Sequence, residues 1–363
     1  MKLCTIVGAR PQFIKAATLS RVIATLPRVN EIIIHTGQHY DSNMSVQFFD
    51  ELAIPTPAYS LNIGSGSHGQ QTGQMLGAIE DVLLQEKPDW VLVYGDTNST
   101  LAGALASVKL HIPVAHVEAG LRSFNRKMPE EINRIATDHV SEVLFTPTLH
   151  ASQQLLKEGI APGRISQVGD VMYDATLFYN EYNTARQTIV ETLNLFRGSF
   201  VLATIHRAEN TDDKDRLHSI CDALIELGDS QEIVFPVHPR TRAALNQSGY
   251  YEKLQQRLTL IEPVGYLDML ALERHASLIV TDSGGVQKEA YFNQVPCITL
   301  RDETEWIELV DFGWNRLCSP AKPFSLLRMI AQLEKPAVDK SIQLYGDGSA
   351  AEKIIDYLLH FPH

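Results

Sequence analysis

Short apolar segments alternate with helix-length amphipathic segments along the chain, and this alternation constrains the fold more than any other feature. Short apolar strands that are bounded by Gly, Pro or Asp and separated by helices are typical of parallel sheets built from β-α-β units. The predicted strands form two series, comprising residues 3–7, 31–36, 90–94, 114–117 and 143–145, and then 200–204, 233–237, 258–261, 278–281 and 297–300. The sequence therefore predicts an α/β protein with two Rossmann-like, doubly wound domains.

The length of 363 residues also favours two domains, because single hydrophobic cores rarely grow to that size. We place the boundary after Val171, so that residues 1–171 form an N-terminal domain and residues 172–348 form a C-terminal domain. An amphipathic helix is predicted within residues 349–363, and we expect it to complete the N-terminal domain.

Composition excludes several classes of partner. A net charge of −12 argues against nucleic acid or an anionic membrane as the main partner, because both require a basic face. The four cysteines, Cys4, Cys221, Cys297 and Cys318, contain no CxxC pair, so we expect reduced thiols and no metal site. The first residues lead directly into a strand, without the apolar stretch of a signal peptide, so we expect a cytoplasmic protein.

Ligands of open α/β sheets bind at the carboxyl ends of the strands, so the residues that follow each strand are candidates. After the first strand, Gly8 allows a tight turn and close approach of a ligand, and Arg10 and Lys15 place two cations near a helix start. The alternative is an ordinary turn with solvated charges. The segment is not GxGxxG, and no acidic residue follows the second strand, so the sequence argues against NAD.

Carboxylates follow the next two strands. Asp96 follows the third strand, where it would place a carboxylate at the ligand-binding edge of the sheet. Its alternative role is to cap the next helix, as Thr97 or Asn98 could also do. Glu118 ends the fourth strand before a glycine turn, and its alternative role is a surface salt bridge with Arg122.

A further carboxylate lies in the first turn of the following predicted helix. Pro129 opens this helix, and Glu131 suits its dipole there, so a purely structural role is one interpretation. Arg134 lies three residues later, so the two side chains could share a helix face.

In the second half of the chain, residues 281–289 are the most informative segment. Ser283, Gly284 and Gly285 place backbone N–H groups at a predicted helix N-terminus with little steric cover, which makes a phosphate cradle. Glu289, one turn further, suits hydroxyls such as a ribose diol. Other polar side chains that follow strands in this half are those of His206, His238, Arg301 and Glu305.

Eight motifs in this order resemble those of the non-hydrolysing UDP-N-acetylglucosamine 2-epimerases over essentially the whole chain: GARPQFIK, YGDTNST, HVEAGLRS, PEEINR, HRAEN, HPR, DSGGVQKE and RDETEW. The resemblance implies a glycosyltransferase-B-like fold, with a central cleft between two Rossmann-like domains that close on the ligand. It also implies a UDP-sugar substrate, a homodimer and no bound cofactor.

The resemblance implies Arg10, Lys15, Asp96, Glu118, Glu131 and His206 around the sugar and diphosphate, and Ser283, Gly284, Gly285, Glu289 and Arg301 around UDP. The C2 proton would leave while UDP departs from C1, and both would then return to the resulting glycal. This scheme needs an acid and a base, cations and N–H donors for the diphosphate, and exclusion of water. We expect Asp96 and Glu131 to transfer protons, and we add Arg134, His238 and Glu305 to the binding set.

Three departures from the family pattern bear on the substrate. Gln12 replaces a glutamate, and Ala208 replaces an arginine. Regulated bacterial members bind a second UDP-GlcNAc through a Gln-His-Arg-type segment and through an arginine in an R-Q-T stretch. Here the first segment reads QHYD at residues 38–41, and Gln70 stands in place of the arginine. We therefore expect no activation by UDP-GlcNAc. The departures resemble a branch that acts on UDP-2,3-diacetamido-2,3-dideoxy-glucuronate in surface polysaccharide synthesis, and a neutral Gln12 near the sugar would ease binding of the uronate carboxylate.

Other functions fit parts of the same pattern. The first is plain UDP-GlcNAc 2-epimerisation, and the second is a hydrolysing epimerase that releases UDP and free sugar. A retaining glycosyltransferase would need an acceptor site, for which we find no motif, and a UDP-sugar sensor would bind without catalysis.

Overall fold

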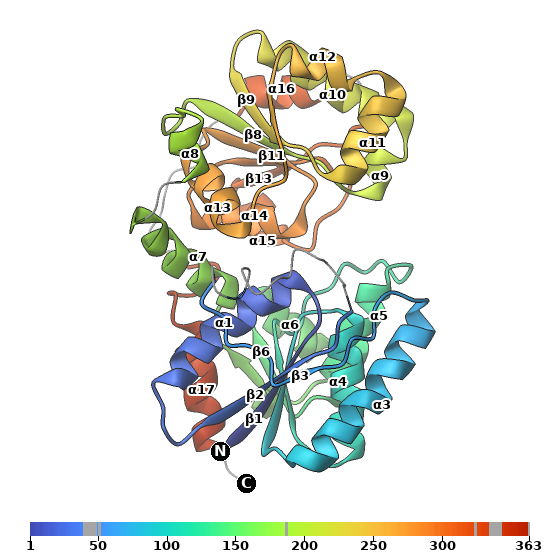
Figure 1. The fold of residues 1–363 in the computed structure, drawn as a ribbon, viewed down its shortest axis with the longest axis vertical. Helices are drawn as coiled ribbons and strands as arrows, with labels where there is room; N and C mark the ends of the chain where they lie inside the picture. Colours follow the sequence, from blue (N-terminus) through green and yellow to red (C-terminus); the bar gives the residue numbers. More distant parts are fainter. Residues whose placement is uncertain (39–48, 50–51, 186–187, 323–324, 334–342, 362–363) are drawn as a thin grey trace. The chain divides into compact units, whose positions relative to one another are not determined.

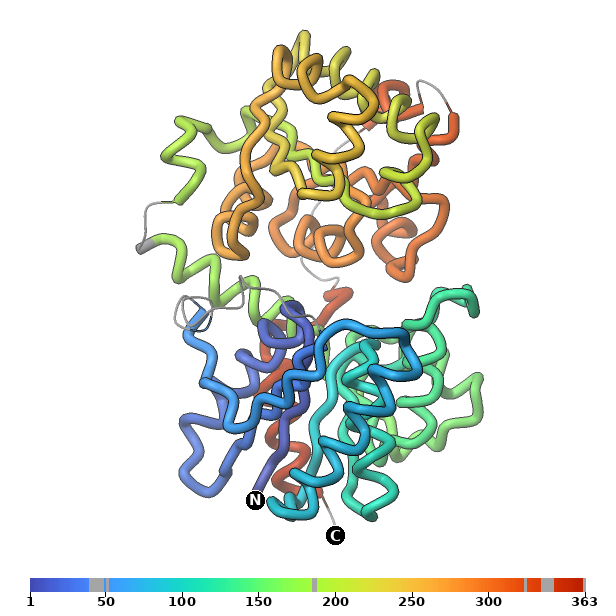
Figure 2. The backbone as a smooth tube through the Cα atoms, turned by 45° about the vertical axis from the view of Figure 1, so that its right-hand side comes forward, coloured from blue at the N-terminus to red at the C-terminus, as the bar shows by residue number. Residues whose placement is uncertain are grey.

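The structure is a computed structural model, and it describes residues 1–38, 49, 52–185, 188–322, 325–333 and 343–361. The chain divides into two compact units, one comprising Met1–Ala175 with Gln343–His363 and the other Thr176–Ile342. Each unit contains one parallel sheet covered by helices (Figure 1). Both ends of the chain belong to the first unit, as the tube in Figure 2 shows.

The sheet of the first unit has the strand order β3-β2-β1-β4-β5-β6-β7. Its strands are β1 (Lys2–Val7), β2 (Asn30–His35), β3 (Tyr59–Ser60), β4 (Trp90–Tyr94), β5 (Val114–Val117), β6 (Val143–Thr146) and β7 (Ile165–Gln167). Helices α1 (Arg10–Ala24) and α17 (Ala350–His360) pack together on one side of the sheet, and α3 (His68–Glu86), α4 (Asn98–Lys109) and α5 (Pro129–Val140) form a row on the other (Figure 1). Helices α6 (Leu149–Lys157) and α7 (Val171–Tyr182) follow the last two strands.

The sheet of the second unit has the strand order β10-β9-β8-β11-β12-β13. Its strands are β8 (Phe200–Thr204), β9 (Glu232–Pro236), β10 (Thr259–Ile261), β11 (Leu278–Thr281), β12 (Cys297–Thr299) and β13 (Asn315–Leu317). Its helices are α8 (Ile189–Thr192), α9 (Ala208–Thr211), α10 (Lys214–Gly228), α11 (Pro239–Ser248), α12 (Tyr251–Gln255), α13 (Tyr266–His275), α14 (Gly284–Phe292), α15 (Ile307–Asp311) and α16 (Ser325–Ala331).

Both faces of the central strand β8 are buried, which explains why this strand is apolar at nearly every position. Val201 and Ala203 of β8 belong to the hydrophobic cluster that includes α10, whereas Phe200 and Leu202 belong to the cluster that includes α13. Successive side chains of a strand point to opposite faces, so a strand with helices on both sides needs a continuous apolar run.

The ten predicted strands are all present, with ends shifted by at most one residue. The three strands that the sequence did not predict, β3, β7 and β13, lie at sheet edges and have only two or three residues each. Most of their residues are partly exposed, so they lack the apolar run that reveals a buried strand.

The C-terminal segment returns to the first unit and packs closely against it. A Cβ atom at Gly169 would lie 2.8 Å from the carbonyl oxygen of Tyr345, and the φ of Gly169 is +99°. The N–H of Asp170 donates to the same carbonyl at 2.9 Å. The close backbone approach at Gly169 therefore helps to hold the segment that leads into α17.

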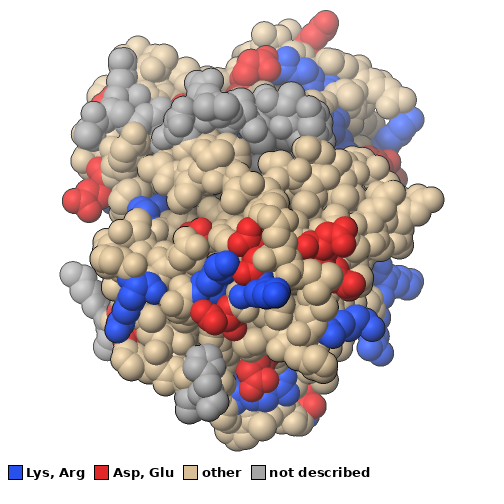
Figure 3. All heavy atoms as spheres, turned by 60° about the horizontal axis from the view of Figure 1, so that its bottom comes forward, with Lys and Arg blue, Asp and Glu red and all other residues tan. Residues whose placement is uncertain are grey.

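Other properties of the chain follow its composition. All four cysteines are buried free thiols, as the sequence predicted. On the face shown in Figure 3, basic and acidic side chains lie close to one another rather than in separate patches. Over the described part of the chain, no helix combines the length and apolar character that crossing a membrane requires.

Gly169→Ala should destabilise the protein more than Gly159→Ala. Both glycines have a positive φ, so alanine costs about 1–2 kcal/mol of backbone strain at either site. Gly159 has no atom within 4 Å of the added methyl group, whereas at Gly169 the Tyr345 carbonyl must move, which adds about 1–3 kcal/mol. Urea unfolding of both variants measures the difference, and equal losses would contradict the close docking of the C-terminal segment.

Candidate active site

The strand order of each sheet reverses direction at one point, between β1 and β4 in the first unit and between β8 and β11 in the second. Ligands of doubly wound sheets bind beyond the carboxyl ends of the strands at such a point. The turns there carry Gly8 and Asp96 in the first unit, and His206 and Ser283 in the second. Many of the residues singled out from the sequence therefore lie at the two ligand-binding edges.

Asp96 and Arg134 form an ion pair at the edge of the first sheet. The Arg134 Nη2 atom lies 2.5 Å from Asp96 Oδ2, and its Nη1 atom lies 3.1 Å from Glu131 Oε2. The expectation that Glu131 and Arg134 share a helix face is thus confirmed. The capping role for Asp96 is wrong, because the Thr97 hydroxyl accepts the N–H of Thr100 and caps α4. The carboxylate of Asp96 remains 31% exposed.

Glu118 pairs with Lys15 rather than with Arg122. The Glu118 Oε2 atom accepts a hydrogen bond from Lys15 Nζ, and the two side chains are only 9% and 12% exposed. Arg122 is occupied by Asp138 and Glu158, so the predicted salt bridge with Glu118 is wrong. Glu118 also has a φ of +72°, a strained value for a residue with a side chain.

Glu131 is buried, with 1% of its surface exposed. Its carboxylate accepts hydrogen bonds from the Ser123 N–H at 2.8 Å, the Ser123 hydroxyl at 3.0 Å and the Phe124 N–H at 3.0 Å, besides that from Arg134. Burial alone would raise the pKa of Glu131, but these donors outweigh it and hold the pKa below its usual range. Glu131 is therefore an ionised side chain that fixes the loop after β5 and orients Arg134.

Two residues of the first turn have different roles from those the sequence suggested. A Cβ atom at Gly8 would lie within about 2.2 Å of the hydroxyl oxygens of Thr36 and Ser99, so packing between turns, not a ligand, requires glycine there. The Gln12 carbonyl accepts the N–H of Gly8 at 2.8 Å, and its amide donates to the Tyr94 carbonyl at 2.7 Å. Gln12 is 2% exposed, so its side chain offers almost no surface for direct contact with a sugar carboxylate.

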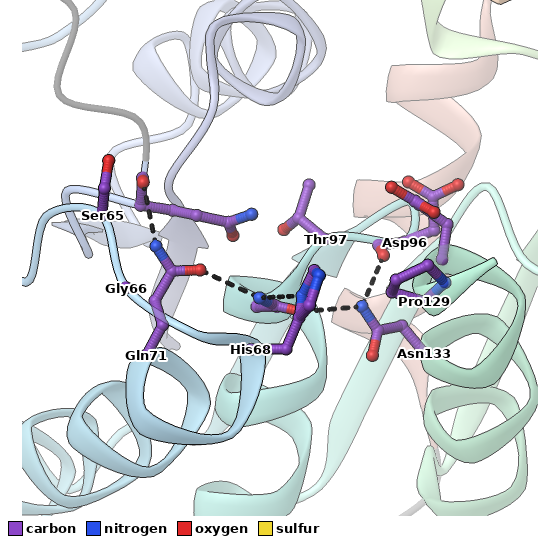
Figure 4. A pocket seen from close by; sticks show the side chains of 11 residues that line it. Ser65, Gly66, His68, Gln71, Asp96, Thr97, Pro129 and Asn133 are labelled. Carbon is purple, nitrogen blue, oxygen red and sulfur yellow. Dashed lines mark hydrogen bonds between the residues drawn. The ribbon is translucent and has the colours of Figure 1, made fainter. Parts of the chain in front are cut away.

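A polar pocket of about 320 Å³ lies next to Asp96 (Figure 4). A network of amides crosses it, in which Asn133 donates to Asn98, and Asn98 donates to Gln71. Figure 4 shows Asp96 and Asn133 on one side of the pocket and Gln71 on the other. The remaining lining residues are Gln38, Ser65, Gly66, His68, Thr97, Pro129 and Glu130. No local sequence pattern predicts this network, because its amides come from separate segments.

The segments expected to differ from a regulatory UDP-GlcNAc site are only partly described. Gln38 is buried, and its side-chain carbonyl accepts the Ser99 N–H at 2.9 Å. Gln70 is exposed and accepts a hydrogen bond from Ser67. Residues 39–41 lie outside the described residues. Arg10 is the first residue of α1 and is partly exposed.

In the second unit, a buried Asp282 holds His206. Asp282 is 0% exposed, accepts the N–H groups of His206 and Arg207, and lies 3.2 Å from His206 Nδ1. Burial lowers the pKa of His206 below its usual value, although the charge of Asp282 opposes this shift. His206 Nδ1 therefore donates to Asp282, which leaves Nε2 for a ligand. The His238 ring is 5.9 Å away, and its Nδ1 accepts the Arg240 N–H.

The start of α14 is open above its first residues. Ser283 is the N-cap, and Gly284 and Gly285 follow it with ordinary negative φ values. Within the part of the chain that the structure describes, a Cβ atom at either glycine would have no neighbour closer than 3.8 Å, so these surroundings do not require glycine there. The first N–H groups of a helix lack intrahelical partners and attract anions. The structure thus has room for a phosphate at this helix start.

Arg301 and Glu305 lie beside this helix start. Arg301 is 2% exposed, and its Nη1 atom donates to Glu305 Oε2 at 2.9 Å. Among the described residues its buried Nε atom has no hydrogen-bond partner and lies 3.8 Å from Glu209 Oε1, and a buried donor of this kind suits an acceptor on a ligand. Glu289 is 7% exposed and lies near the buried Glu273. Burial, together with the charge of Glu289, raises the pKa of Glu273 well above its usual range.

The structure thus brings the candidates together in groups within each unit. Asp96, Glu131 and Arg134 form one ion-pair network. The Lys15–Glu118 pair lies next to the turn that carries Asp96, because a Cβ atom at Gly95 would lie 3.5 Å from Lys15 Nζ. In the second unit, the sites around His206, Gly284 and Arg301 share the edge formed by β8, β11 and β12. Over the described residues, no cluster of three or more His, Cys, Asp or Glu side chains could hold a metal ion.

Known proteins resemble this chain over nearly its whole length. The profile of a family described as UDP-N-acetylglucosamine 2-epimerase matches residues 21–359. A UDP-N-acetylglucosamine 2-epimerase homolog of Methanococcus maripaludis is 56% identical over 361 residues, which are 99% of each chain. The UDP-2,3-diacetamido-2,3-dideoxy-D-glucuronate 2-epimerase of Pseudomonas aeruginosa is 52% identical over 365 residues, also 99% of each chain.

Solved structures show the same fold. The crystal structure of Methanocaldococcus jannaschii UDP-GlcNAc 2-epimerase in complex with UDP-GlcNAc and UDP superposes with a TM-score of 0.89 at 47% identity, covering 99% of this chain and 100% of that chain. The crystal structure of MurG from Acinetobacter baumannii has a TM-score of 0.59 at 12% identity, which indicates a shared fold alone.

Glu131→Gln should remove part of the acid sensitivity of folding. A carboxylate whose pKa is lower in the folded state than in the unfolded state stabilises the fold above its unfolded pKa, and this contribution is lost as the pH falls through the folded pKa. The variant should be less stable at pH 7 and should lose less stability between pH 5 and pH 3, since about 4.3 is the ordinary pKa of glutamate. Urea unfolding across this range measures both effects. Glu130→Gln, at the exposed neighbouring position, is the control, and an unchanged acid profile for Glu131→Gln would contradict the assignment.

Proposed function

This chain belongs to the UDP-N-acetylglucosamine 2-epimerase family, and from that membership we propose which sugar it inverts and which side chains do so. It is a non-hydrolysing UDP-sugar 2-epimerase, an isomerase with a glycosyltransferase-B-like fold. We propose that the substrate is UDP-2,3-diacetamido-2,3-dideoxy-glucuronate, consumed in surface polysaccharide synthesis. The Pseudomonas relative and the departures at Ala208 and Gln70 support this sugar. The Methanocaldococcus relative favours the alternative, UDP-GlcNAc.

The proposed reaction proceeds by elimination and re-addition. A base takes the proton from C2 while the bond between C1 and the diphosphate oxygen breaks, and its electron pair leaves with UDP. The resulting glycal has a double bond between C1 and C2. A proton then adds to C2 from the opposite face, and UDP returns to C1, so the product has the inverted configuration and the same atoms.

The observation that carries the proton-transfer roles is the pairing of two partly accessible carboxylates with cations at one sheet edge. Asp96 pairs with Arg134 and borders the pocket, and Glu118 pairs with Lys15. Glu131 is enclosed by four donors, which supports an orienting role more than a direct one. We therefore assign proton transfer to Asp96 and Glu118, one as the base that takes the C2 proton and the other, in its protonated form, as the acid that supplies a proton to the opposite face.

The second unit would bind the nucleotide. The open helix start at Ser283 to Gly285 suits the diphosphate, Arg301 offers a buried donor, and Glu289 would accept the ribose hydroxyls. Asp282 holds His206 through Nδ1, so Nε2 would face the diphosphate, and the imidazolium form of His206 would donate from Nε2 as the diphosphate departs. The homodimer that the family resemblance implied and the cytoplasmic location expected from the sequence are part of this proposal.

Parallel assays with both UDP-sugars test the substrate. We expect kcat/KM for UDP-2,3-diacetamido-2,3-dideoxy-glucuronate to exceed that for UDP-GlcNAc by at least about tenfold, a difference of about 1.4 kcal/mol in transition-state binding. Incubation in D₂O with mass spectrometry gives an independent readout, because proton exchange places deuterium at C2. Asp96→Asn should slow this incorporation by about 100-fold or more while still binding UDP. A higher kcat/KM for UDP-GlcNAc would overturn the substrate, and undiminished exchange in Asp96→Asn would remove Asp96 from the mechanism.

Gly284→Ala and Gly285→Ala should weaken UDP binding without destabilising the fold. Neither added methyl group meets a protein atom closer than 3.8 Å, so thermal stability should be unchanged or slightly higher. The methyl group would instead occupy the space proposed for the diphosphate, and we expect a loss of about tenfold or more in affinity, measured by calorimetry with UDP. Gly77→Ala, in an open part of α3 in the other unit, is the control. Unchanged UDP affinity in both variants would place the diphosphate elsewhere.

A further inference from the structure

A buried histidine in the HVEAGLRS motif has no assigned role. His116 lies on β5, and its side chain is 0% exposed. Its Nδ1 atom is 2.7 Å from Asp138 Oδ1, and its Nε2 atom is 2.7 Å from the carbonyl oxygen of Gly95. Both ring nitrogens therefore face oxygen atoms.

Asp138 is ionised in this arrangement. Its other contacts are the Gly120 N–H at 3.2 Å and Arg122 Nη1 at 2.7 Å, both of them donors to Oδ2, and the charge of Arg122 favours the ionised carboxylate. Burial alone would raise the pKa of Asp138, but His116 and Arg122 outweigh it and hold the pKa below its usual range. Glu158 binds Arg122 through two hydrogen bonds of 2.9 and 2.7 Å.

The protonation of His116 follows from its partners. A neutral imidazole has one donor and one acceptor nitrogen, whereas two acceptors at 2.7 Å require two N–H groups. His116 is thus an imidazolium. Its positive charge and that of Arg122 are balanced by Asp138 and Glu158, so the buried group is neutral as a whole. A buried charge needs this compensation, because desolvation alone would expel it.

The imidazolium and its counter-ion connect the two turns that carry the proposed acid and base. His116 binds the carbonyl of Gly95, the residue before Asp96, and Asp138 binds the N–H of Gly120, two residues after Glu118. The carbonyl of Asp96 itself accepts a hydrogen bond from Asn133 at 2.9 Å. The backbone on both sides of the Asp96 side chain is thus held by neighbouring elements.

We propose that His116, kept as an imidazolium by Asp138, is a positioning residue that fixes the turn of Asp96 against the turn of Glu118. This inference rests on the proposed roles of these two carboxylates. The charged groups that face this assembly are Arg122 and Glu158 behind Asp138, and the pairs Lys15–Glu118 and Arg134–Asp96 at the turns. His116 belongs to neither the Lys15–Glu118 nor the Arg134–Asp96 pair. Its removal should therefore shift the carboxylates of these pairs without removing a contact to the substrate.

The protonation state is tested first, on the unmodified protein. In ¹⁵N-labelled enzyme at the assay pH, the ring of His116 should show two protected N–H protons and the nitrogen shifts of an imidazolium. The spectrum of His116→Gln identifies the His116 signals, and the spectrum of Asp138→Asn does so if the first variant does not fold. A single ring N–H would overturn the proposal, whatever the catalytic result.

The positioning role is tested by kinetics. His116→Gln and Asp138→Asn should each lower kcat by about 10- to 100-fold and leave KM within about threefold, as expected when catalytic groups shift by a fraction of an ångström. The double variant should be little slower than the slower single one, because both changes disrupt one assembly. The pH profile of kcat should also shift in His116→Gln.

A structural control separates positioning from general destabilisation. Val114→Ala leaves a cavity at the other end of the same strand, where Val114 is 0% exposed. It should lower stability while keeping kcat and its pH profile. Equal kcat losses in Val114→Ala and His116→Gln would overturn the positioning role. If the wild-type enzyme epimerises neither UDP-sugar, the proposed function fails instead, and the spectra still report the state of His116.

Discussion

The side-chain amide of Gln12 joins the turn after β1 to the turn after β4, and the candidate site of the first unit depends on the position of these two turns. Its carbonyl accepts the N–H of Gly8 and its amide donates to the carbonyl of Tyr94, so one side chain links the ends of β1 and β4. These strands flank the point where the strand order reverses. At such a point the loops leave their strands in opposite directions, so hydrogen bonds between the loops are needed to keep them close together. The full use of both amide groups explains why this side chain is buried.

In the proposed mechanism, the two units contribute different chemistry to one reaction. The first unit presents carboxylates that are each neutralised by a cation, Asp96 by Arg134 and Glu118 by Lys15. A diphosphate can approach such pairs without meeting an uncompensated negative charge, despite the net charge of −12. The second unit presents mainly N–H groups, at the start of α14 and on Arg301. Proton transfer and leaving-group stabilisation are therefore assigned to separate sheets.

Much of the fold could be predicted from the sequence, because strands buried on both faces need continuous apolar runs. The edge strands β3, β7 and β13 were missed for the opposite reason. In the site, the Glu131–Arg134 contact was predictable, since three residues along a helix bring side chains together.

The tertiary partners of the site residues were not predictable from the sequence. His116 and Asp138 are 22 residues apart and His206 and Asp282 are 76 apart, so no local pattern pairs them. Gln12 was misinterpreted because only its lack of charge was considered, whereas its hydrogen bonds determine its place.

The backbone at Glu118 has a consequence for how this enzyme can change. Its φ of +72° is one that glycine adopts without cost, whereas a glutamate there is strained. Selection for a more robust protein would favour glycine at this position and would discard the carboxylate that pairs with Lys15. With the proton-transfer role proposed for Glu118, stability and turnover are opposed at this position, and a consensus or thermostabilising redesign of this chain should leave residue 118 untouched.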